Sequence, residues 1–251
     1  MNAKLLKIAS SPFVFEIISV FIYSFYCLVF SIGAIPSFLL INAGVRLLGM
    51  GTFQHFIFLW LCFFAIYLFW IFAAITVGIF EHIFTHGFKP GIYDMNSTTF
   101  LRWMINSGLH LWAIYLVLPF LQGSNWIKVY LRIAGAKIGK NVHLNTRIIN
   151  DVCLLKIEDN VIVGGDAVIT CHLFDNGKLM LGKISLGEGT MVGANAYLTP
   201  GTTTCKNSKI GTYTRLGINT YIKEGEIITV LPGMSLRQVA SLIRKSRYLI
   251  K

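Results

Sequence analysis

A histidine in a short polar segment is the side chain best suited to chemistry in this chain of 251 residues. His172 follows Cys171 directly, and the second half of the sequence has only one other histidine, His143. A neutral imidazole has an ordinary pKa of about 6.5 and can take a proton from an attacking hydroxyl or amine. His172 is therefore a candidate general base, and Cys171 a weaker candidate nucleophile. A loop histidine that only packs is the alternative.

The segment that must position His172 repeats every six residues. Aliphatic side chains recur in one phase at Ile138, Leu144, Ile157, Val163, Ile169, Leu186, Val192, Leu198, Ile210, Leu216, Ile222 and Ile228, with Thr204 as the polar exception. A period of six differs from the two of a strand and the 3.6 of a helix, and it is typical of a β-helix whose short strands alternate with corners. We predict a left-handed parallel β-helix over about 136–232, rather than a β-sandwich with accidental spacing.

The six-residue phase breaks twice, and His172 lies in the second break. Leu144 to Ile157 spans thirteen residues, one more than two repeats, whereas Ile169 to Leu186 spans seventeen, one fewer than three. Residues 171–183 are therefore expected to leave the coil as a loop. On such a loop, His172 would lie beside the groove where neighbouring copies of the coil meet.

Composition divides the chain near residue 122. The mean hydropathy is +0.65 and only 13% of residues are charged, so the chain is too apolar for an ordinary soluble protein. Most of the charge, about +9 of the net +11, lies in 123–251. We expect a transmembrane helical domain (1–122), a basic β-helix domain (123–233) and a basic amphipathic C-terminal helix (234–251) that suits acidic lipid headgroups.

Several apolar segments of the first half could cross a membrane. Residues 53–80 carry no formal charge, 100–121 form a less apolar candidate, and Pro36 separates 13–34 from the shorter 35–50. Basic residues at Lys4, Lys7, Lys128, Arg132, Lys137 and Lys140 favour a cytoplasmic N-terminus and a cytoplasmic β-helix at the cell inner membrane. Both orientations require an even number of crossings. The 13–50 segment is then a helical hairpin or a re-entrant surface element, and the choice stays open.

Asn106 and His110 form a polar pair within the candidate segment 100–121. Their i, i+4 spacing places them on one helix face, and polar groups inside a membrane segment are site candidates. They could contact a lipid-linked acceptor or hydrogen-bond a neighbouring helix. Glu81, His82 and His86 do not share a face, so no metal site is expected there. The five cysteines lack metal-site spacing and are expected to be reduced structural thiols.

Two stretches of the sequence resemble a known family. The segment HGFKPGIYDMNSTTFLRW (86–103) and the segment ITCHLFDNGKLMLGKISLGEGTMVGANAYLTPG (169–201) resemble the membrane-bound C-terminal region of polylysine-type nonribosomal peptide synthetases, which contains hexapeptide-repeat acyltransferase-like domains. The resemblance covers about 50–230. Adenylation and carrier domains are missing from this chain, so peptide synthesis is not carried over. The Met-x-x-Gly segment of that family is shifted here to 180–182.

The resemblance implies an integral-membrane acyltransferase with His172 as the general base. The nearest carboxylates that could orient the imidazole are Asp175 and Asp166. The backbone at Gly193, Ala194 and Asn195 could stabilise an oxyanion, and Lys206, Lys209 and Arg215 could bind the phosphates of coenzyme A, unless they form a solvated basic face. The expected donor is acetyl-coenzyme A or another acyl thioester, and no metal is expected.

The acceptor is expected to be a hydroxyl or amine near the membrane, and it could be lipid- or glycan-linked. The family also implies a homotrimer. Contact with membrane lipid is expected from the apolar segments, and no nucleic-acid partner is expected. A non-catalytic trimeric scaffold that organises membrane helices is the alternative function. A β-helical metal hydratase is disfavoured, because each site would need three histidines and the second half contains only His143 and His172.

Overall fold

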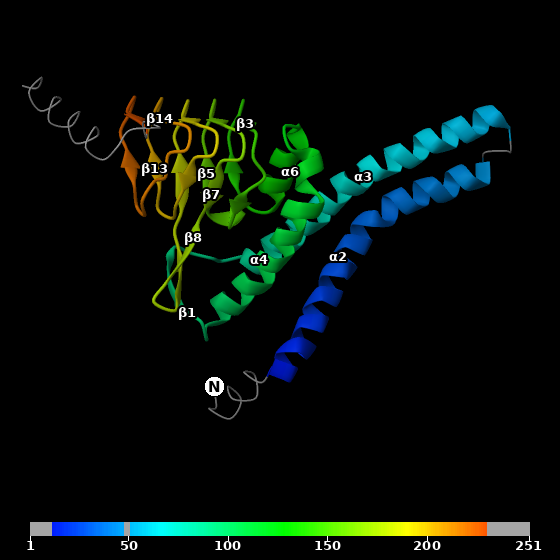
Figure 1. Cartoon of the computed structure of the whole chain (residues 1–251), viewed down its shortest axis with the longest axis horizontal. Helices are drawn as coiled ribbons and strands as arrows, with labels where there is room; N and C mark the ends of the chain where they lie inside the picture. The colour runs from blue at the N-terminus through cyan, green and yellow to red at the C-terminus, as the bar shows by residue number, and fades with distance from the viewer. Residues whose placement is uncertain (1–11, 48–50, 230–251) are drawn as a thin grey trace, which may run out of the picture.

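A computed structural model describes residues 12–47 and 51–229 of the chain. The predicted amphipathic helix at 234–251 and the basic residues Lys4 and Lys7 lie outside the described residues. Helices form most of the first half and β-strands most of the second, as Figure 1 shows.

Two long helices, α2 (Pro12–Leu47) and α3 (Thr52–Thr85), lie side by side as a hairpin (Figure 1). The expectation that Pro36 separates two elements is wrong, because α2 continues through it. Close packing against α3 supports α2 next to Pro36: the Ser37 hydroxyl donates to the Ala65 carbonyl at 2.6 Å. At Gly33 a β-carbon would clash with the backbone of Ala73, so glycine permits this approach.

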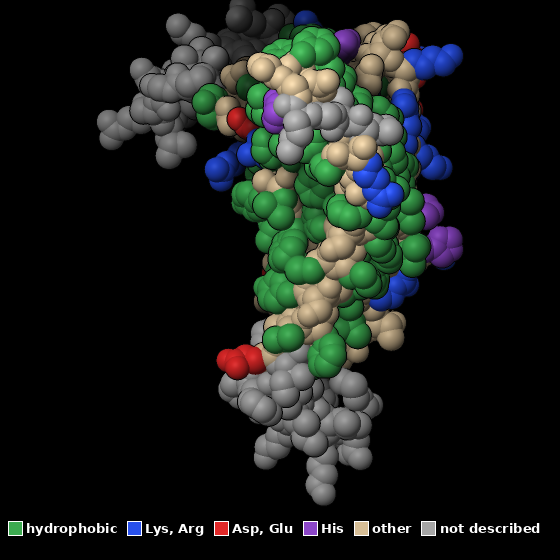
Figure 2. All heavy atoms as spheres, turned by 90° about the vertical axis from the view of Figure 1, so that its right-hand side faces the viewer, with side chains coloured by type: hydrophobic (Ala, Val, Ile, Leu, Met, Phe, Trp, Pro, Cys, Tyr) green, Lys and Arg blue, Asp and Glu red, His purple; other side chains and the backbone are tan. Residues whose placement is uncertain are grey.

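The α2–α3 hairpin exposes most of its apolar surface. Both helices are long and apolar enough to cross a membrane by length and composition, and only 17% of the most apolar window in each is buried. Hydrophobic side chains dominate the elongated face seen in Figure 2. Exposed aromatic residues such as Phe21, Phe56 and Phe63 contribute to this surface. Such a surface indicates contact with lipid or another apolar partner.

Shorter helices connect the hairpin with the second half. The candidate span 100–121 is divided into α4 (Thr98–Leu116) and α5 (Leu118–Leu121), and α6 (Asn125–Ile133) follows. Within the described residues, α4 is not among the helices apolar enough to cross a membrane. It packs against α3 and buries Asn106 and His110 on one face, as their spacing predicted.

Three parallel sheets form the walls of a coil. The first contains β2 (Lys137–Ile138), β5 (Leu155–Ile157), β10 (Ile184–Leu186), β13 (Thr203–Thr204) and β15 (Tyr221–Ile222). The second contains β3 (His143–Leu144), β6 (Ile162–Val163), β11 (Met191–Val192), β14 (Lys209–Ile210) and β16 (Ile227–Ile228). The third contains β4 (Ile149–Asn150), β7 (Val168–Thr170) and β12 (Tyr197–Leu198). Outside the excursion at 171–183, the strands from β2 to β14 belong to the three sheets in turn, which confirms the predicted parallel β-helix (Figure 1).

Side chains of the six-residue phase fill the interior of the coil. Leu186, Leu198 and Ile222 are fully buried, and the small corner residues Thr190 and Thr202 are fully buried as well. Thr204, the polar exception, shares a hydrogen bond of 2.8 Å with Thr190 and accepts the Gly187 N–H at 2.9 Å. Its buried hydroxyl is therefore satisfied.

The predicted excursion at 171–183 is a β-hairpin. Strands β8 (His172–Asp175) and β9 (Lys178–Leu181) pair antiparallel, and β1 (Gly91–Asp94) adds to the other edge of β9. This three-stranded sheet joins the segment before α4 to the excursion from the β-helix (Figure 1). The two stretches that carried the family resemblance thus meet in one structural unit.

Candidate active site

His172 is paired with a buried aspartate from the preceding turn of the coil. Its Nδ1 lies 2.6 Å from Oδ2 of Asp151, whose side chain is only 3% exposed, against 25% for the histidine. The Thr170 hydroxyl lies 3.3 Å from the same ring nitrogen. A carboxylate accepts the Nδ1–H proton, so the neutral ring presents the lone pair of Nε2 to its surroundings. This is the tautomer that a general base requires.

An indole from helix α4 holds the other oxygen of that carboxylate. Trp103 Nε1 donates to Asp151 Oδ1 at 2.7 Å, and the Trp103 ring contacts the His172 ring edge to face, with centroids 4.9 Å apart. Phe174 packs against the same indole at 5.2 Å. The imidazole is therefore fixed by a hydrogen bond on one side and by aromatic packing on the other.

The coil geometry explains why Asp151 reaches His172. In the third sheet, Ile149 pairs with Ile169 and Asn150 with Thr170, so the residues that follow these strands lie side by side. Asp151 adopts a left-handed backbone conformation (φ 56°), which aspartate tolerates better than most residues, and begins a short 3-10 turn, η1 (Val152–Leu154). The first break in the six-residue phase thus supplies the partner of the histidine in the second break.

The expectation that Asp175 or Asp166 orients His172 is corrected by this geometry. Asp175 is exposed at the end of β8, where it pairs in register with Lys178. Asp166 is also exposed and lies 3.9 Å from Arg147. Asp151 was missed because its contact with His172 depends on the register of the coil.

A cavity of about 320 Å³ opens beside the Asp151–His172 pair. From the β-helix it is lined by Asn150, Asp151 and His172, and from α4 by Trp103, Asn106, Ser107, Gly108, His110 and Leu111. The structure therefore brings together the excursion histidine and the polar pair of α4, which the sequence analysis treated as separate. The lining combines a candidate base with polar side chains and an apolar edge, as small-molecule sites commonly do.

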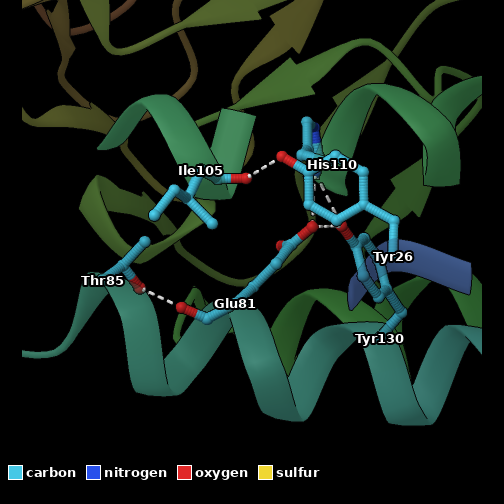
Figure 3. A network of polar contacts seen from close by, with 6 residues as sticks. All are labelled: Tyr26, Glu81, Thr85, Ile105, His110 and Tyr130. Atoms are coloured by element: carbon cyan, nitrogen blue, oxygen red, sulfur yellow. Dashed lines mark hydrogen bonds and ion pairs between the residues drawn. The ribbon is translucent and has the colours of Figure 1, made fainter. Parts of the chain in front are cut away.

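A second carboxylate–histidine pair adjoins the cavity, because His110 is part of the lining; Figure 3 shows this pair. Glu81 Oε1 of α3 lies 2.9 Å from His110 Nδ1 and accepts the Tyr130 hydroxyl at 2.8 Å. Burial raises the pKa of Tyr130 well above its ordinary value, so the phenol stays protonated and donates. His110 therefore does hydrogen-bond neighbouring helices, which was one of the two alternatives for it.

The segment before Trp103 supports this arrangement. Ser97 caps α4 by accepting the Phe100 N–H at 3.1 Å. Arg102 donates to the His86 carbonyl at 2.6 Å and lies over the Phe88 ring. These contacts fix the start of α4 and hence the position of Trp103.

The predicted oxyanion residues lie at a corner between the second and third sheets. The Gly193 N–H donates to the Ile210 carbonyl at 2.7 Å and the Asn195 N–H to the Gly165 carbonyl at 2.9 Å. Those two amides are engaged within the coil, which argues against them as oxyanion donors. Among the three, only the Ala194 amide remains a candidate.

The predicted coenzyme A residues are exposed but distributed around the coil. Lys209 lies on β14 in the second sheet, and Arg215 bridges to Tyr197 in the third. Lys206 follows β13 in the first sheet, and its Nζ lies 2.9 Å from Glu188 Oε2. A single copy of the chain therefore does not gather these three cations at one point.

Cys171 is unsuited to nucleophilic chemistry. It is fully buried, and burial raises the pKa of its thiol well above the ordinary value, so the thiolate is disfavoured. All five cysteines are free, as predicted. Across the described residues, no group of three or more His, Cys, Asp or Glu side chains is arranged to hold a metal ion.

Comparison with known proteins supports the repeat assignment. Residues 183–212 match the family model described as the hexapeptide repeat of succinyl-transferase. The delta-poly-L-ornithine synthetase of Acinetobacter baumannii is 30% identical over 154 residues, which are 61% of this chain and 11% of that protein. This match is longer than the segment 123–251, so it extends into the helical half. The provisionally assigned acetyltransferase YvoF of Bacillus subtilis is 28% identical over 87 residues, 33% of this chain and 49% of that protein.

Among solved structures, similarity is weaker. A galactoside acetyltransferase in complex with coenzyme A aligns with a TM-score of 0.41 at 13% identity, covering 62% of this chain and 90% of that chain. A maltose O-acetyltransferase from Clostridium difficile 630 aligns with a TM-score of 0.39 at 16% identity, covering 57% and 89%. This chain spans half or less of the two curated relatives. By repeat, strand order and sequence similarity, the β-helix of this chain is a hexapeptide-repeat domain.

Proposed function

We propose that this protein is a membrane-bound acyltransferase in which His172 is the general base and Asp151 orients it. One observation carries the proposal: the buried Asp151 carboxylate fixes His172 Nδ1 at 2.6 Å beside a cavity large enough for a small acceptor. A scaffold would gain nothing from a buried carboxylate–imidazole pair at the edge of a cavity. The hexapeptide repeat and the acetyltransferase assignment of one relative support the same class of reaction.

The reaction transfers an acyl group from a thioester to a hydroxyl or amine. His172 Nε2 removes the proton of the acceptor as its oxygen or nitrogen attacks the thioester carbonyl carbon. Collapse of the tetrahedral adduct breaks the carbon–sulfur bond. The imidazolium then returns its proton to the departing thiolate, so the products are the acylated acceptor, a free thiol and neutral His172. Asp151 stabilises the transient positive charge.

The donor in this proposal is acetyl-coenzyme A or another acyl thioester. Lys209 and Arg215 are exposed cations on neighbouring walls of the coil and suit phosphate groups. Lys206 would first have to leave Glu188. Because the cations lie on different walls, a complete donor site would combine faces of adjacent subunits in a homotrimer. The Ala194 amide is the remaining candidate for the oxyanion.

Placement in the inner membrane belongs to the same proposal. The α2–α3 hairpin provides two apolar helices, and two crossings would return the chain to the side on which it started. This satisfies the even number required for a cytoplasmic N-terminus and a cytoplasmic β-helix. Helix α4 would then lie at the membrane boundary, between lipid and the candidate active site.

The experiment compares His172→Ala with His143→Ala in purified protein reconstituted in nanodiscs. Isotope-labelled acetyl-coenzyme A is supplied with a lipid and glycolipid extract, and acylated products are detected by mass spectrometry. His172→Ala should lower transfer by about a hundredfold or more, the scale for loss of a general base. His143 is exposed on β3, so its replacement should leave transfer unchanged. Equal transfer by both variants, or no donor turnover by the wild type, would favour the scaffold.

A further inference from the structure

A second, apolar groove adjoins the His172 cavity. It has a volume of about 210 Å³ and lies between α2 and α4, where its walls include Ile18, Ile22, Met104 and Trp112. Gly108 and Leu111 line both the groove and the cavity, so the two spaces meet at these residues. One wall of the groove is formed by α2, which is one of the two helices apolar enough to cross a membrane.

Gly108 allows this junction to form. A β-carbon at Gly108 would clash with the Tyr26 hydroxyl, which donates to the Ile105 carbonyl at 2.7 Å. Glycine therefore permits α2 and α4 to approach closely at the boundary between the groove and the cavity. An apolar chain lying in the groove would direct its polar end past this point towards His172.

The cavity contains polar atoms that lack partners. Asn106 Oδ1 and His110 Nε2 are buried and have no hydrogen-bond partner among the described residues. Each of these two residues is only 4% exposed, and both line the cavity. A buried unpaired polar atom costs free energy, so such atoms commonly mark a site for a ligand or water. Asn106 Oδ1 accepts hydrogen bonds. Burial lowers the pKa of His110, but the neighbouring Glu81 carboxylate raises this pKa overall, so His110 Nε2 accepts when the ring is neutral and donates when it is protonated.

Charge at the cavity restricts the ligand further. Its lining includes the Asp151 carboxylate and contains no lysine or arginine, and Glu81 lies directly behind His110. An anionic headgroup would be repelled by these carboxylates and would find no lysine or arginine to pair with. A neutral or cationic headgroup with several hydroxyl or amine donors matches the unpaired Asn106 oxygen, and a hydroxyl can pair with His110 Nε2 in either protonation state.

We infer that the acyl acceptor is an amphiphile that enters from the membrane, with its alkyl chain in the α2–α4 groove and a donor-rich, non-anionic headgroup in the His172 cavity. This inference rests on the proposed function for the role of the headgroup as acceptor. The position of the chain rests separately on the groove and its continuity with the cavity. Asn106 is a headgroup-binding residue in this arrangement, and Leu111 is a chain-binding residue.

Photolabelling tests the site without requiring catalysis. The full-length protein in phosphatidylcholine nanodiscs is irradiated with dodecyl glucoside carrying a diazirine on its chain, and excess unmodified dodecyl glucoside defines specific labelling. Dodecylamine and dodecyl phosphate probes with the same diazirine complete the series. Specific labelling by the glucoside or amine probe should fall on α2 and α4, and the phosphate probe should label at least about fivefold less. Equal labelling by all three probes would overturn the headgroup assignment.

Matched variants on one helix test the groove. Leu111 and Leu116 are both half-exposed on α4, at 50% and 51%, but only Leu111 lines the groove and the cavity. Leu111→Trp should lower specific labelling by about fivefold or more, because the indole occupies the junction, and Leu116→Trp should not. Asn106→Leu should also lower labelling by about fivefold while the melting temperature stays equal or rises, since an unpaired buried oxygen is removed. Equal labelling of the two Trp variants would overturn the inference.

Acyl transfer to the same probes separates this inference from the proposed function. With acetyl-coenzyme A, the dodecyl glucoside and dodecylamine probes should be acetylated in a His172-dependent manner, and methyl glucoside or methylamine at least about tenfold more slowly. Equal rates for long and short acceptors would contradict the inference and leave the acyltransferase proposal intact. Specific labelling of the groove without transfer to any probe would contradict the acyltransferase proposal and leave the amphiphile site intact.

Discussion

Trp103 Nε1 and Asp151 Oδ1 lie 2.7 Å apart, and this hydrogen bond connects helix α4 with the β-helix. The second oxygen of Asp151 holds His172, so a single buried carboxylate links the helical half to the proposed base. The orientation of the imidazole is therefore coupled to the position of α4. A change in how α2 and α3 pack on α4 would therefore alter the orientation of His172, because the Trp103–Asp151 and Asp151–His172 hydrogen bonds connect the two.

Asp151→Asn should lower acyl transfer by about a hundredfold or more while the fold survives. The asparagine oxygen can still accept the Trp103 N–H, but its amide group then donates towards His172 Nδ1. The neutral imidazole must then present its Nδ1 lone pair to that donor, and its proton moves to Nε2. Nε2 therefore has no lone pair with which to take the proton of the acceptor. Kinetics with acetyl-coenzyme A in nanodiscs measure the effect. Asp175→Asn is the control, since Asp175 is exposed on β8; a comparable loss in both variants would contradict the role of Asp151.

Trp103→Phe should destabilise the protein by about 1–3 kcal/mol, because it removes the donor to a buried carboxylate oxygen. Activity should fall as well, since the ring that packs against His172 changes shape. The melting temperature in detergent reports the stability. It is followed by far-ultraviolet circular dichroism rather than by tryptophan fluorescence, because the substitution removes a tryptophan. Trp126→Phe on α6 provides the matched change at a more exposed position, 37% exposed, and should have little effect. An unchanged melting temperature in Trp103→Phe would argue against the structural role of this hydrogen bond.

The β-helix could be predicted from the sequence because its geometry is local and repeated. Every turn places the same positions inside, so Leu186 and Leu198 identify the interior without knowledge of other elements. His172 could be singled out as well, since the break in phase requires an excursion there. The sequence signal for Asp151 was a carboxylate in the other break, but using it required the register that places Asn150 beside Thr170.

Contacts between the two halves of the chain could not be predicted in this way. Trp103 reaches Asp151 only because β1 joins the β8–β9 hairpin and positions the start of α4. No period in the sequence relates residue 103 to residue 151. Likewise, Pro36 indicated a helix end by local rules, whereas packing of α2 along α3 keeps the helix continuous. Tertiary packing overrides the local signal in both cases.

Cys153 and Cys171 should resist alkylation in the folded protein at pH 8. Burial raises the pKa of the Cys153 thiol to about 11 and that of Cys171 well above its ordinary value, so both remain neutral thiols at this pH. Iodoacetamide labelling followed by peptide mass spectrometry should show slow modification, with the Cys153 rate rising as the pH approaches 11. The same protein unfolded in guanidinium should label rapidly at both positions. Fast modification of folded Cys171 at pH 8 would reopen its role as a nucleophile.

An engineered disulfide should form between β1 and β9 in the variant Ile92→Cys with Met180→Cys. These residues face each other in the antiparallel pair, where α-carbon separations of about 4.5–5.5 Å suit a disulfide. Mild oxidation should produce the cross-linked peptide in high yield, and transfer activity should be retained because neither side chain lines the His172 cavity. Ile92→Cys with Ser185→Cys provides a control, since Ser185 lies on β10 in a different sheet. Preferential cross-linking of the control pair would show that the segment before α4 does not pair with the excursion. The pairing that positions Trp103 to hydrogen-bond Asp151, and so to orient His172, would then be absent.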